Sequence, residues 1–233
     1  MTKTATIDAL DGNGSFTAYV AEPAGTPTAA IIVIQEIFGV NAGIRRKCDT
    51  LAEAGYLASA PDLFHQLEPG IELDPDIAPE MQRALGLMGR FDQDQGVRDI
   101  EATIRAARAA LGGSGKVGAV GYCLGGRLAY MTAARTDVDA SVGYYAVGID
   151  GLLRECHAIA NPLMLHIPQD DHFVDHATQA AMHAGLDDHP KVTLYDYPGE
   201  DHGFATEFGK RRSPAAAGEA DARTMAFFAE HLC

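Results

Sequence analysis

The feature that most restricts the fold of this sequence is a regular alternation between short β-type runs and segments of helical period. The runs are rich in β-branched and aromatic residues, and such an alternation is typical of a parallel sheet covered by helices. The run AAIIVIQ is apolar on both pleat faces, as a strand buried on both sides requires. We expect strands at 29–35, 56–60, 116–122, 140–145, 162–167 and 192–197, after an N-terminal hairpin around 11–12 and 15–21.

Helical segments fill the gaps between these strands. Apolar residues recur at spacings of three and four over 97–111, which predicts an amphipathic helix. Asn41 is expected to cap a helix that ends at Gly55, and the Ser-Pro pair at 213–214 is expected to begin a C-terminal helix. The sequence therefore predicts an α/β fold, with a mostly parallel central sheet and helices on both faces.

The length of 233 residues suits one α/β domain. The acidic stretch 67–79 contains three prolines, and we interpret it as a surface excursion that borders the site, not as a linker. We expect residues 1–233 to form a single domain.

The charge balance narrows the classes of partner. The chain carries 18 basic and 32 acidic residues, and a net charge of −14 repels phosphate backbones and anionic lipid. No apolar run approaches the length of a membrane span, and the N-terminus lacks the apolar core of a signal peptide. We expect a cytoplasmic protein, a monomer or small homo-oligomer, that binds neither nucleic acid nor membrane.

Neither cysteines nor histidines are spaced like metal ligands. The cysteines form no CxxC pair, so a zinc site or a disulfide framework is not predicted. Cys48 falls on an apolar helix stripe and is expected in the core, while Cys156 and Cys233 are expected to be chemically inert. His172 and His176 stand four residues apart, but no HExxH is present. We predict no metal and no cofactor.

The sharpest local signal is the hexapeptide GYCLGG at 121–126. It follows a predicted strand and precedes a helical run, and glycines flank a nucleophilic side chain, as in the G-x-S-x-G nucleophile elbow. Cysteine stands in the serine position, so Cys123 is the candidate nucleophile. The alternative is a glycine-rich turn that contains a buried, inert cysteine.

A nucleophilic cysteine needs a base, and the base needs an orienting acid. Asp171 follows the strand PLMLHI and lies 48 residues after Cys123, while His202 follows VTLYDY and lies 31 residues after Asp171. Each interval fits one strand and one helix, in the order nucleophile, acid, histidine. Because open α/β sheets bind ligands at strand carboxyl ends, we expect these three side chains to meet there.

The loop QEIFGVN at 35–41 follows the first long buried strand. Its backbone N–H groups could supply one half of an oxyanion hole, with the N–H of Leu124 as the other half. Glu36 is expected at the edge of the same crevice, and the alternative is a solvated loop acid. Aromatic residues that adjoin the catalytic loops either line an acyl pocket or serve ordinary packing: Phe38, Tyr145, Phe173 and Phe204.

QEIFGVN, GYCLGG, QDDHF and DHGFA, in this order and spacing, resemble the dienelactone hydrolases, also called carboxymethylenebutenolidases. The resemblance runs from about residue 16 to 228 and implies an α/β-hydrolase fold with a Cys-His-Asp triad. It implies Cys123 as nucleophile, His202 as base, Asp171 as orienting acid and Glu36 as partner of the resting thiol. Ile37 and Leu124 match the backbone positions of the oxyanion hole.

Two departures from the family pattern concern the substrate pocket. Dienelactone-cleaving members bind the substrate carboxylate through two arginines, and the matching positions here are Met81 and Thr206. A phenol expected in place of Leu85 is also missing. These substitutions predict a preference for neutral or bulkier esters, unless another arginine reaches the pocket: Arg83, Arg127, Arg211 or Arg212.

Two functions follow from these residues. The first is a hydrolase that cleaves a small ester or lactone through Cys123 and a thioester acyl-enzyme. The second is a non-catalytic ligand-binding or thiol-sensing protein that keeps the hydrolase fold, because fold does not imply function. The complete set of Cys123, Asp171 and His202 favours the hydrolase.

Overall fold

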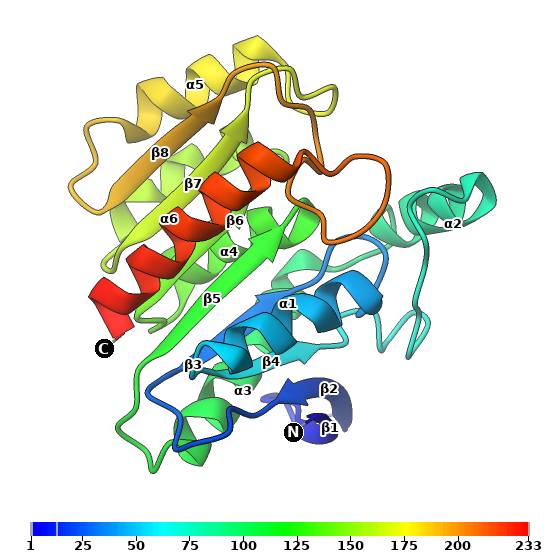
Figure 1. Cartoon of the computed structure of the whole chain (residues 1–233), viewed down its shortest axis with the longest axis vertical. Helices are drawn as coiled ribbons and strands as arrows, with labels where there is room; N and C mark the ends of the chain where they lie inside the picture. Colours follow the sequence, from blue (N-terminus) through cyan, green and yellow to red (C-terminus); the bar gives the residue numbers. More distant parts are fainter. Residues whose placement is uncertain (1, 13, 233) are drawn as a thin grey trace.

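The computed structural model describes residues 2–12 and 14–232, and one eight-stranded sheet runs through them (Figure 1). The strand order is β1-β2-β4-β3-β5-β6-β7-β8. β1 and β2 are antiparallel to their neighbours, and the other strands are parallel. The strands are β1 (Thr2–Asp8), β2 (Ser15–Ala21), β3 (Ala30–Ile34), β4 (Leu57–Pro61), β5 (Val117–Tyr122), β6 (Ala140–Tyr144), β7 (Leu163–Pro168) and β8 (Val192–Tyr197).

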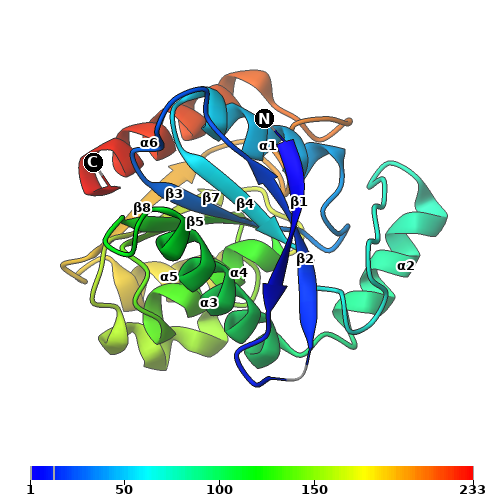
Figure 2. The same cartoon turned by 90° about the horizontal axis from the view of Figure 1, so that it is seen from below.

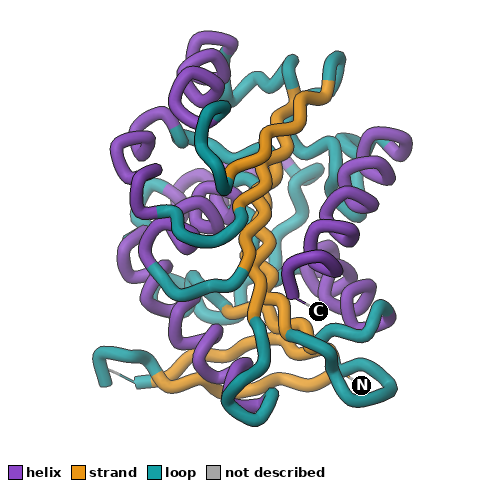
Figure 3. Tube along the Cα trace, turned by 90° about the vertical axis from the view of Figure 1, so that its left-hand side faces the viewer, coloured by secondary structure: helices purple, strands orange, loops and turns teal. Residues whose placement is uncertain are grey.

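Helices cover both faces of the sheet, which confirms the predicted layers (Figure 3). α1 and α6 pack on one face, while α3, α4 and α5 pack on the other (Figures 1 and 2). The helices are α1 (Ala42–Glu53), α2 (Ala78–Met88), α3 (Gln93–Ala110), α4 (Leu124–Arg135), α5 (His176–Leu186) and α6 (Pro214–Leu232), with a 3-10 segment η1 (Asp150–Ala158).

The sequence signals that predicted these elements have local physical causes. The Asn41 side chain accepts hydrogen bonds from the Gly43 and Ile44 N–H groups, so it caps α1. Every residue of the central strands β3, β5, β6 and β7 is buried. This burial explains why their sequences are apolar on both faces. The expected strand bounds are confirmed to within a residue at each end.

The excursion after β4 borders the site as predicted, because Pro75 lines the cavity that contains Cys123. It leads into α2, which stands away from the body of the molecule (Figures 1 and 2). Cys48 is buried in the core, as expected, whereas Cys233 lies outside the described residues. No helix in the described ranges is long and apolar enough to cross a bilayer.

Candidate active site

Five side chains of interest follow the carboxyl ends of parallel strands. The strands are paired so that their carboxyl ends meet at one edge of the sheet. The residues, in spatial order from β3 to β8, are Glu36, Cys123, Tyr145, Asp171 and His202. The structure therefore brings the predicted nucleophile, acid and base to the same edge, from segments far apart in the chain.

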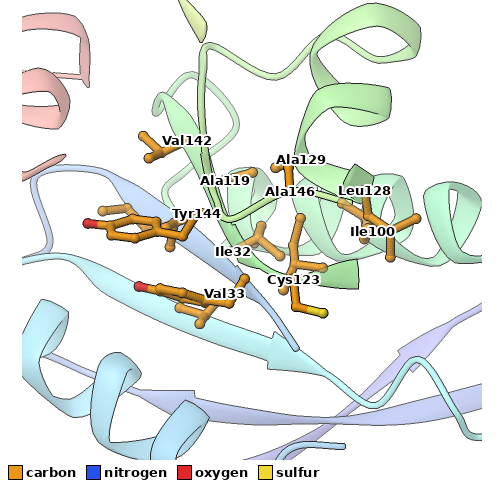
Figure 4. Close-up of a cluster of buried hydrophobic side chains, with 14 of the residues drawn as sticks. Ile32, Val33, Ile100, Ala119, Cys123, Leu128, Ala129, Val142, Tyr144 and Ala146 are labelled. Atoms are coloured by element: carbon orange, nitrogen blue, oxygen red, sulfur yellow. The ribbon is translucent and has the colours of Figure 1, made fainter. Parts of the chain in front are cut away.

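Cys123 occupies a strained turn between β5 and α4. Its backbone has φ 57° and ψ −115°, a conformation that costs a non-glycine residue about 1–3 kcal/mol and often marks functional sites. The turn is possible because glycines flank it: a Cβ on Gly121 would lie 1.9 Å from the Gly125 carbonyl oxygen. Cys123 lies beside the buried cluster of β3, β5 and β6, and its side chain is 8% exposed (Figure 4).

His202 and Asp171 form a buried pair. The His202 Nδ1 lies 2.9 Å and 3.1 Å from the two carboxylate oxygens of Asp171. Asp171 also accepts a hydrogen bond from the Phe173 N–H at 2.8 Å, which fixes the carboxylate orientation. This arrangement fixes the imidazole ring and selects the tautomer that carries a proton on Nδ1.

The other ring nitrogen of His202 is free to act on a reacting group. Its Nε2 is buried and has no hydrogen-bond partner in the described part of the chain. Burial by itself would lower the pKa of His202, but the charge of Cys123 and the carboxylate of Asp171 outweigh it and raise the pKa to about 10. Cys123 and His202 line the same cavity. The imidazole is thus electrostatically coupled to the sulfur.

Glu36 is buried, so the alternative of a solvated loop acid is excluded. Burial raises its pKa, while the nearby His202, Tyr145 and Arg211 act in the opposite direction. The carboxyl group lies between two adjoining cavities, and it lines both of them. One holds Cys123 and has a volume of about 90 Å³. The other, of about 520 Å³, lies against the first turn of α1.

The smaller cavity is mostly apolar. Helix α2 supplies one wall through Met81, Leu85 and Met88, whose spacing of four and three places them on one helix face. The predicted pocket residues that line this cavity are Phe38, Met81, Leu85, Phe173 and Thr206. Their role in substrate binding stays a prediction.

Two of the predicted pocket residues lie elsewhere. Tyr145 lines the larger cavity and packs edge-on against the His202 ring, with ring centroids 5.0 Å apart. Phe204 is 1% exposed and lies behind Tyr145, against the Tyr197 ring, so it supports the site from the core. Tyr145 also has a positive φ of 37°, which the sequence did not indicate.

The two predicted oxyanion-hole positions are compatible with that role. Leu124 is the first residue of α4, and the N–H groups of the first helical turn have no intrahelical acceptor. Ile37 lines the cavity that contains Cys123. The positive end of the α4 dipole lies at the start of that helix, next to Cys123, where it favours negative charge.

Of the four arginines considered from the sequence, one lines the small cavity, and it is Arg211. Arg83 on α2 is exposed and pairs with Glu68. Arg127 donates to the Gly148 carbonyl, and Arg212 donates to the Thr206 carbonyl. No local pattern in the sequence distinguishes Arg211, because its position depends on how the loop before α6 folds back over the site.

Sequence reasoning also missed a buried polar network behind the site. His166 on β7 contacts the Tyr197 hydroxyl at 2.8 Å through Nδ1, and the Thr224 hydroxyl at 3.0 Å through Nε2. Burial lowers the pKa of His166 to about 3, so the ring is neutral. Its partners come from β8 and α6, and no local motif connects these elements.

Three potential metal ligands lie close together in residues 2–12 and 14–232: Asp171, His172 and Asp201. Their groups already bind one another or His202, because the His172 Nδ1 lies 2.7 Å from an Asp201 oxygen. These contacts give no reason to assign a metal there.

A sheet of this topology, with a strained turn between β5 and α4 at the candidate nucleophile, defines the α/β-hydrolase class of enzymes. The model of the "Dienelactone hydrolase family" matches residues 16–232, and the chain belongs to that family. The protein is therefore a hydrolase that acts on carboxylic ester or lactone bonds.

Two named relatives support this class. The chain is 45% identical over 222 residues to an Azospirillum brasilense protein provisionally named as a carboxymethylenebutenolidase, covering 94% of this chain and 95% of the relative. It is 38% identical over 229 residues to the carboxymethylenebutenolidase of Pseudomonas putida, covering 98% and 97%.

A solved structure shares the fold along the whole chain. A provisionally named dienelactone hydrolase from Klebsiella pneumoniae has a TM-score of 0.83 and 26% identity, covering 99% of both chains. The family membership favours the hydrolase over the non-catalytic alternative.

Proposed function

We propose that the protein hydrolyses a small ester or lactone through a Cys123–His202–Asp171 triad and a thioester acyl-enzyme. The observation that carries the proposal is the orientation of His202. Its Nδ1 is held by Asp171, while its unpartnered Nε2 belongs to the ring that shares a cavity with Cys123. A nucleophile, a base and an orienting acid in this relation are the requirements for covalent acyl transfer.

Acylation begins when the Cys123 sulfur attacks the substrate carbonyl carbon. His202 takes the proton that leaves the thiol, and its pKa, raised to about 10, favours holding that proton. A carbon–sulfur bond forms, and the carbonyl oxygen becomes an oxyanion. The backbone N–H groups of Ile37 and Leu124 bind that oxyanion, and one such donor is worth about 3 kcal/mol of barrier.

Collapse of the tetrahedral intermediate breaks the bond between carbon and the leaving oxygen. That oxygen takes the proton from His202 Nε2, so a free alcohol, or the open hydroxyl of a lactone, leaves a neutral thioester on Cys123. A water molecule then attacks the thioester and gives its proton to His202. Cleavage of the carbon–sulfur bond releases the carboxylic acid and restores the thiolate with its imidazolium.

Glu36 tunes the resting state in this proposal. An ionised carboxylate beside the sulfur disfavours the thiolate, whereas a protonated one does not. Because burial raises the pKa of Glu36, the acid and the thiol compete for which group carries the negative charge.

The test is hydrolysis of p-nitrophenyl acetate by the purified protein and its variants. Cys123→Ala is expected to lower kcat at least about a thousandfold, and Asp171→Asn at least about a hundredfold, because the triad acts as a unit. Rapid acid quenching during turnover, followed by mass spectrometry, is expected to find one acetyl group on residue 123. Cys156→Ala is the matched control, since Cys156 is a free and partly exposed cysteine.

Full activity in Cys123→Ala would refute the proposed nucleophile. An acetyl group on Cys156 or Cys48, with Cys123 unmodified, would refute it as well. Retention of activity in Asp171→Asn, with Cys123→Ala inactive, would remove Asp171 alone from the triad.

A further inference from the structure

A buried ammonium group lies behind the reacting centre and has no part in the proposed reaction. Lys47 is on α1, and its side chain is 9% exposed. Its Nζ lies 2.8 Å from a carboxylate oxygen of Glu207 and 3.2 Å from both carboxylate oxygens of Asp221. Glu207 is in the loop before α6, and Asp221 is on α6, which shares a face of the sheet with α1 (Figures 1 and 2). Lys47 therefore joins α1 to two segments from the other end of the chain.

The loop that carries Glu207 also follows the proposed base. Glu207 lies five residues after His202, and residues 203–206 between them are buried or partly buried. Thr206, directly before Glu207, lines the cavity that contains Cys123. Because close-packed interiors transmit strain, a displacement of Glu207 moves this short stretch as well. The position of the His202 ring thus depends on where Glu207 is held.

The helix that carries Lys47 begins where the proposed oxyanion loop ends. The loop at 35–41 leads directly into α1, and Asn41 at its end caps the helix through its side chain. Ile37 in the same loop is a proposed oxyanion donor. A helix is held in shape by its backbone hydrogen bonds, so α1 and the end of this loop move together. Lys47 therefore connects the oxyanion loop to the segment that follows His202.

Lys47 is itself held from two further sides. Its Nζ lies 5.3 Å from the centre of the Tyr122 ring, within the range of a cation–π interaction. Tyr122 is the last residue of β5 and directly precedes Cys123. On the α6 side, Asp221 also accepts a hydrogen bond from the Tyr144 hydroxyl at 3.1 Å, which fixes the carboxylate that binds Lys47. The ammonium group is thus a fixed point against which the loop before α6 is held.

Stability alone is a weak explanation for this arrangement. Taking charges out of water is costly, and apolar residues of similar volume often stabilise a fold as well as a buried ion pair does. In some proteins, buried polar groups instead specify a single arrangement of the segments that they join. The segments joined by Lys47 lead to the proposed nucleophile, the proposed base and a proposed oxyanion donor.

We propose that Lys47 is a positioning residue: its ion pair with Glu207 sets the distance between the oxyanion loop and the segment that follows His202. The inference rests on the proposed function of the triad. Lys47 lines the larger cavity and not the one that contains Cys123, so it acts through other groups and not on the reacting atoms. Because it determines where the base and the oxyanion donor lie, its loss is expected to slow acylation more than it weakens substrate binding.

The test measures kcat and KM for p-nitrophenyl acetate at a temperature where circular dichroism shows each variant to be folded. Glu207→Gln removes the charge bound to Lys47 and keeps the size of the side chain. Lys47 stays paired with Asp221, so no buried charge is left isolated. The variant is expected to lower kcat at least about tenfold with KM within about twofold, since a misplacement of about 1 Å at a reacting centre lowers the rate about a hundredfold.

Two lysine variants separate charge from packing. Lys47→Met breaks both ion pairs and is expected to lower kcat at least as much as Glu207→Gln does. Lys47→Arg keeps the charge, and its kcat is expected to be at least about threefold above that of Lys47→Met. If Lys47→Met fails to fold, Glu207→Gln still reports the positioning role.

Asp139→Asn is the matched control. Asp139 is a partly buried carboxylate that pairs with Arg108 at 2.9 Å, and it lies directly before β6, at the amino ends of the strands. The substitution removes an ion pair between remote segments at the edge of the sheet opposite the candidate site. Its kcat is therefore expected to stay within about twofold of wild type.

Hydrogen–deuterium exchange gives a readout that does not depend on turnover. Backbone amides in residues 203–210 are expected to exchange faster in Glu207→Gln and Lys47→Met than in wild type, because the loop loses its anchor. Asp139→Asn is expected to leave exchange in this segment unchanged.

A kcat for Glu207→Gln within about twofold of wild type would overturn the proposal, and so would a loss confined to KM. Faster exchange with an unchanged kcat would show that Lys47 anchors the loop without placing the base, which also overturns it. An equal loss of kcat in Asp139→Asn would attribute the effect to a general loss of stability and overturn the positioning role. Wild-type protein without turnover would refute the proposed function instead, and the exchange measurement would still decide whether Lys47 anchors the loop.

Discussion

Gly125→Ala is expected to disable the site by pushing two segments apart. A Cβ at this position, on the first turn of α4, would lie 2.4 Å from the Ile34 carbonyl oxygen and 2.5 Å from the Gln35 carbonyl oxygen. Real Cβ contacts stay above 3.0 Å, so the backbone gap must open by at least 0.6 Å, from 2.4 Å to 3.0 Å. Both obstacles are backbone atoms, which cannot rotate away as a side chain would.

Gly125→Ala is expected to lower both the stability of the fold and the rate of catalysis. Overpacking a filled interior costs about 1–3 kcal/mol, so the free energy of unfolding is expected to fall by that amount. The displaced carbonyls belong to Ile34 and Gln35, just before Glu36 and Ile37 in the chain, so the shift is also expected to move one proposed oxyanion donor relative to Leu124. A misplacement of about 1 Å at a reacting centre lowers the rate by about a hundredfold.

Urea unfolding followed by far-ultraviolet circular dichroism measures the first effect, and kcat/KM for p-nitrophenyl acetate measures the second. Gly218→Ala in α6 is the matched control, because a Cβ there has nothing within 4 Å. It is expected to raise the free energy of unfolding by up to about 1 kcal/mol and to leave activity unchanged. A Gly125→Ala protein within about 0.5 kcal/mol and twofold of wild type would refute the argument from close backbone approach.

Two further predictions concern charge in the site. Glu36→Gln is expected to raise the thiolate fraction of Cys123, measured by ultraviolet absorbance, at every pH where the wild-type carboxyl is ionised. Where that carboxyl is protonated, the substitution is expected to leave the thiolate fraction unchanged. Identical titration curves for wild type and variant at every pH would show that Glu36 does not act on the thiol. The pKa of His202 is raised from 6.5 to about 10 in the fold, so its contribution to stability is complete below about pH 6.5 and is lost as the pH rises through about 10. Cys123→Ala removes the charge that chiefly raises this pKa, so the free energy of unfolding of the variant is expected to depend less on pH over that range. An equal pH dependence in wild type and variant would show that the sulfur does not interact with the imidazole ring.

The sequence determined the fold and the chain order of the candidate triad because both depend on local patterns. The run at 29–35 is apolar on both faces. That pattern indicates a strand buried on both sides, even when the neighbouring strands are not known. The glycines around Cys123 indicate that helix and strand approach closely. The structure confirms this, because a Cβ at Gly121 would lie 1.9 Å from the Gly125 carbonyl oxygen. Asp171 and His202 could be placed because parallel strands end at one edge of the sheet.

The sequence was less informative where a residue's role depends on distant partners. Phe204 adjoins the histidine in the chain, yet it packs behind Tyr145 and not in the cavity. Helix α2 was not predicted as an element, although its three cavity residues share one face. Glu36 could be placed at the crevice, but its burial was undecided until the loops around it were known.

The amino-acid sequence by itself thus determined the class of fold, the glycine-flanked turn at Cys123 and the strand ends that carry the candidate triad. Glycine spacing and hydrophobic period act over a few residues, so they can be seen without the tertiary structure. Only the tertiary structure decided which arginine lies at the cavity that contains Cys123. Arg83, Arg127, Arg211 and Arg212 are chemically identical in the sequence, and three of them are bonded to groups elsewhere in the chain. Arg211 differs because the loop before α6 holds it over Gly203, beside the cavity of Cys123. A charge is neutralised by what lies near it in space, and that neighbourhood forms only when remote segments pack together.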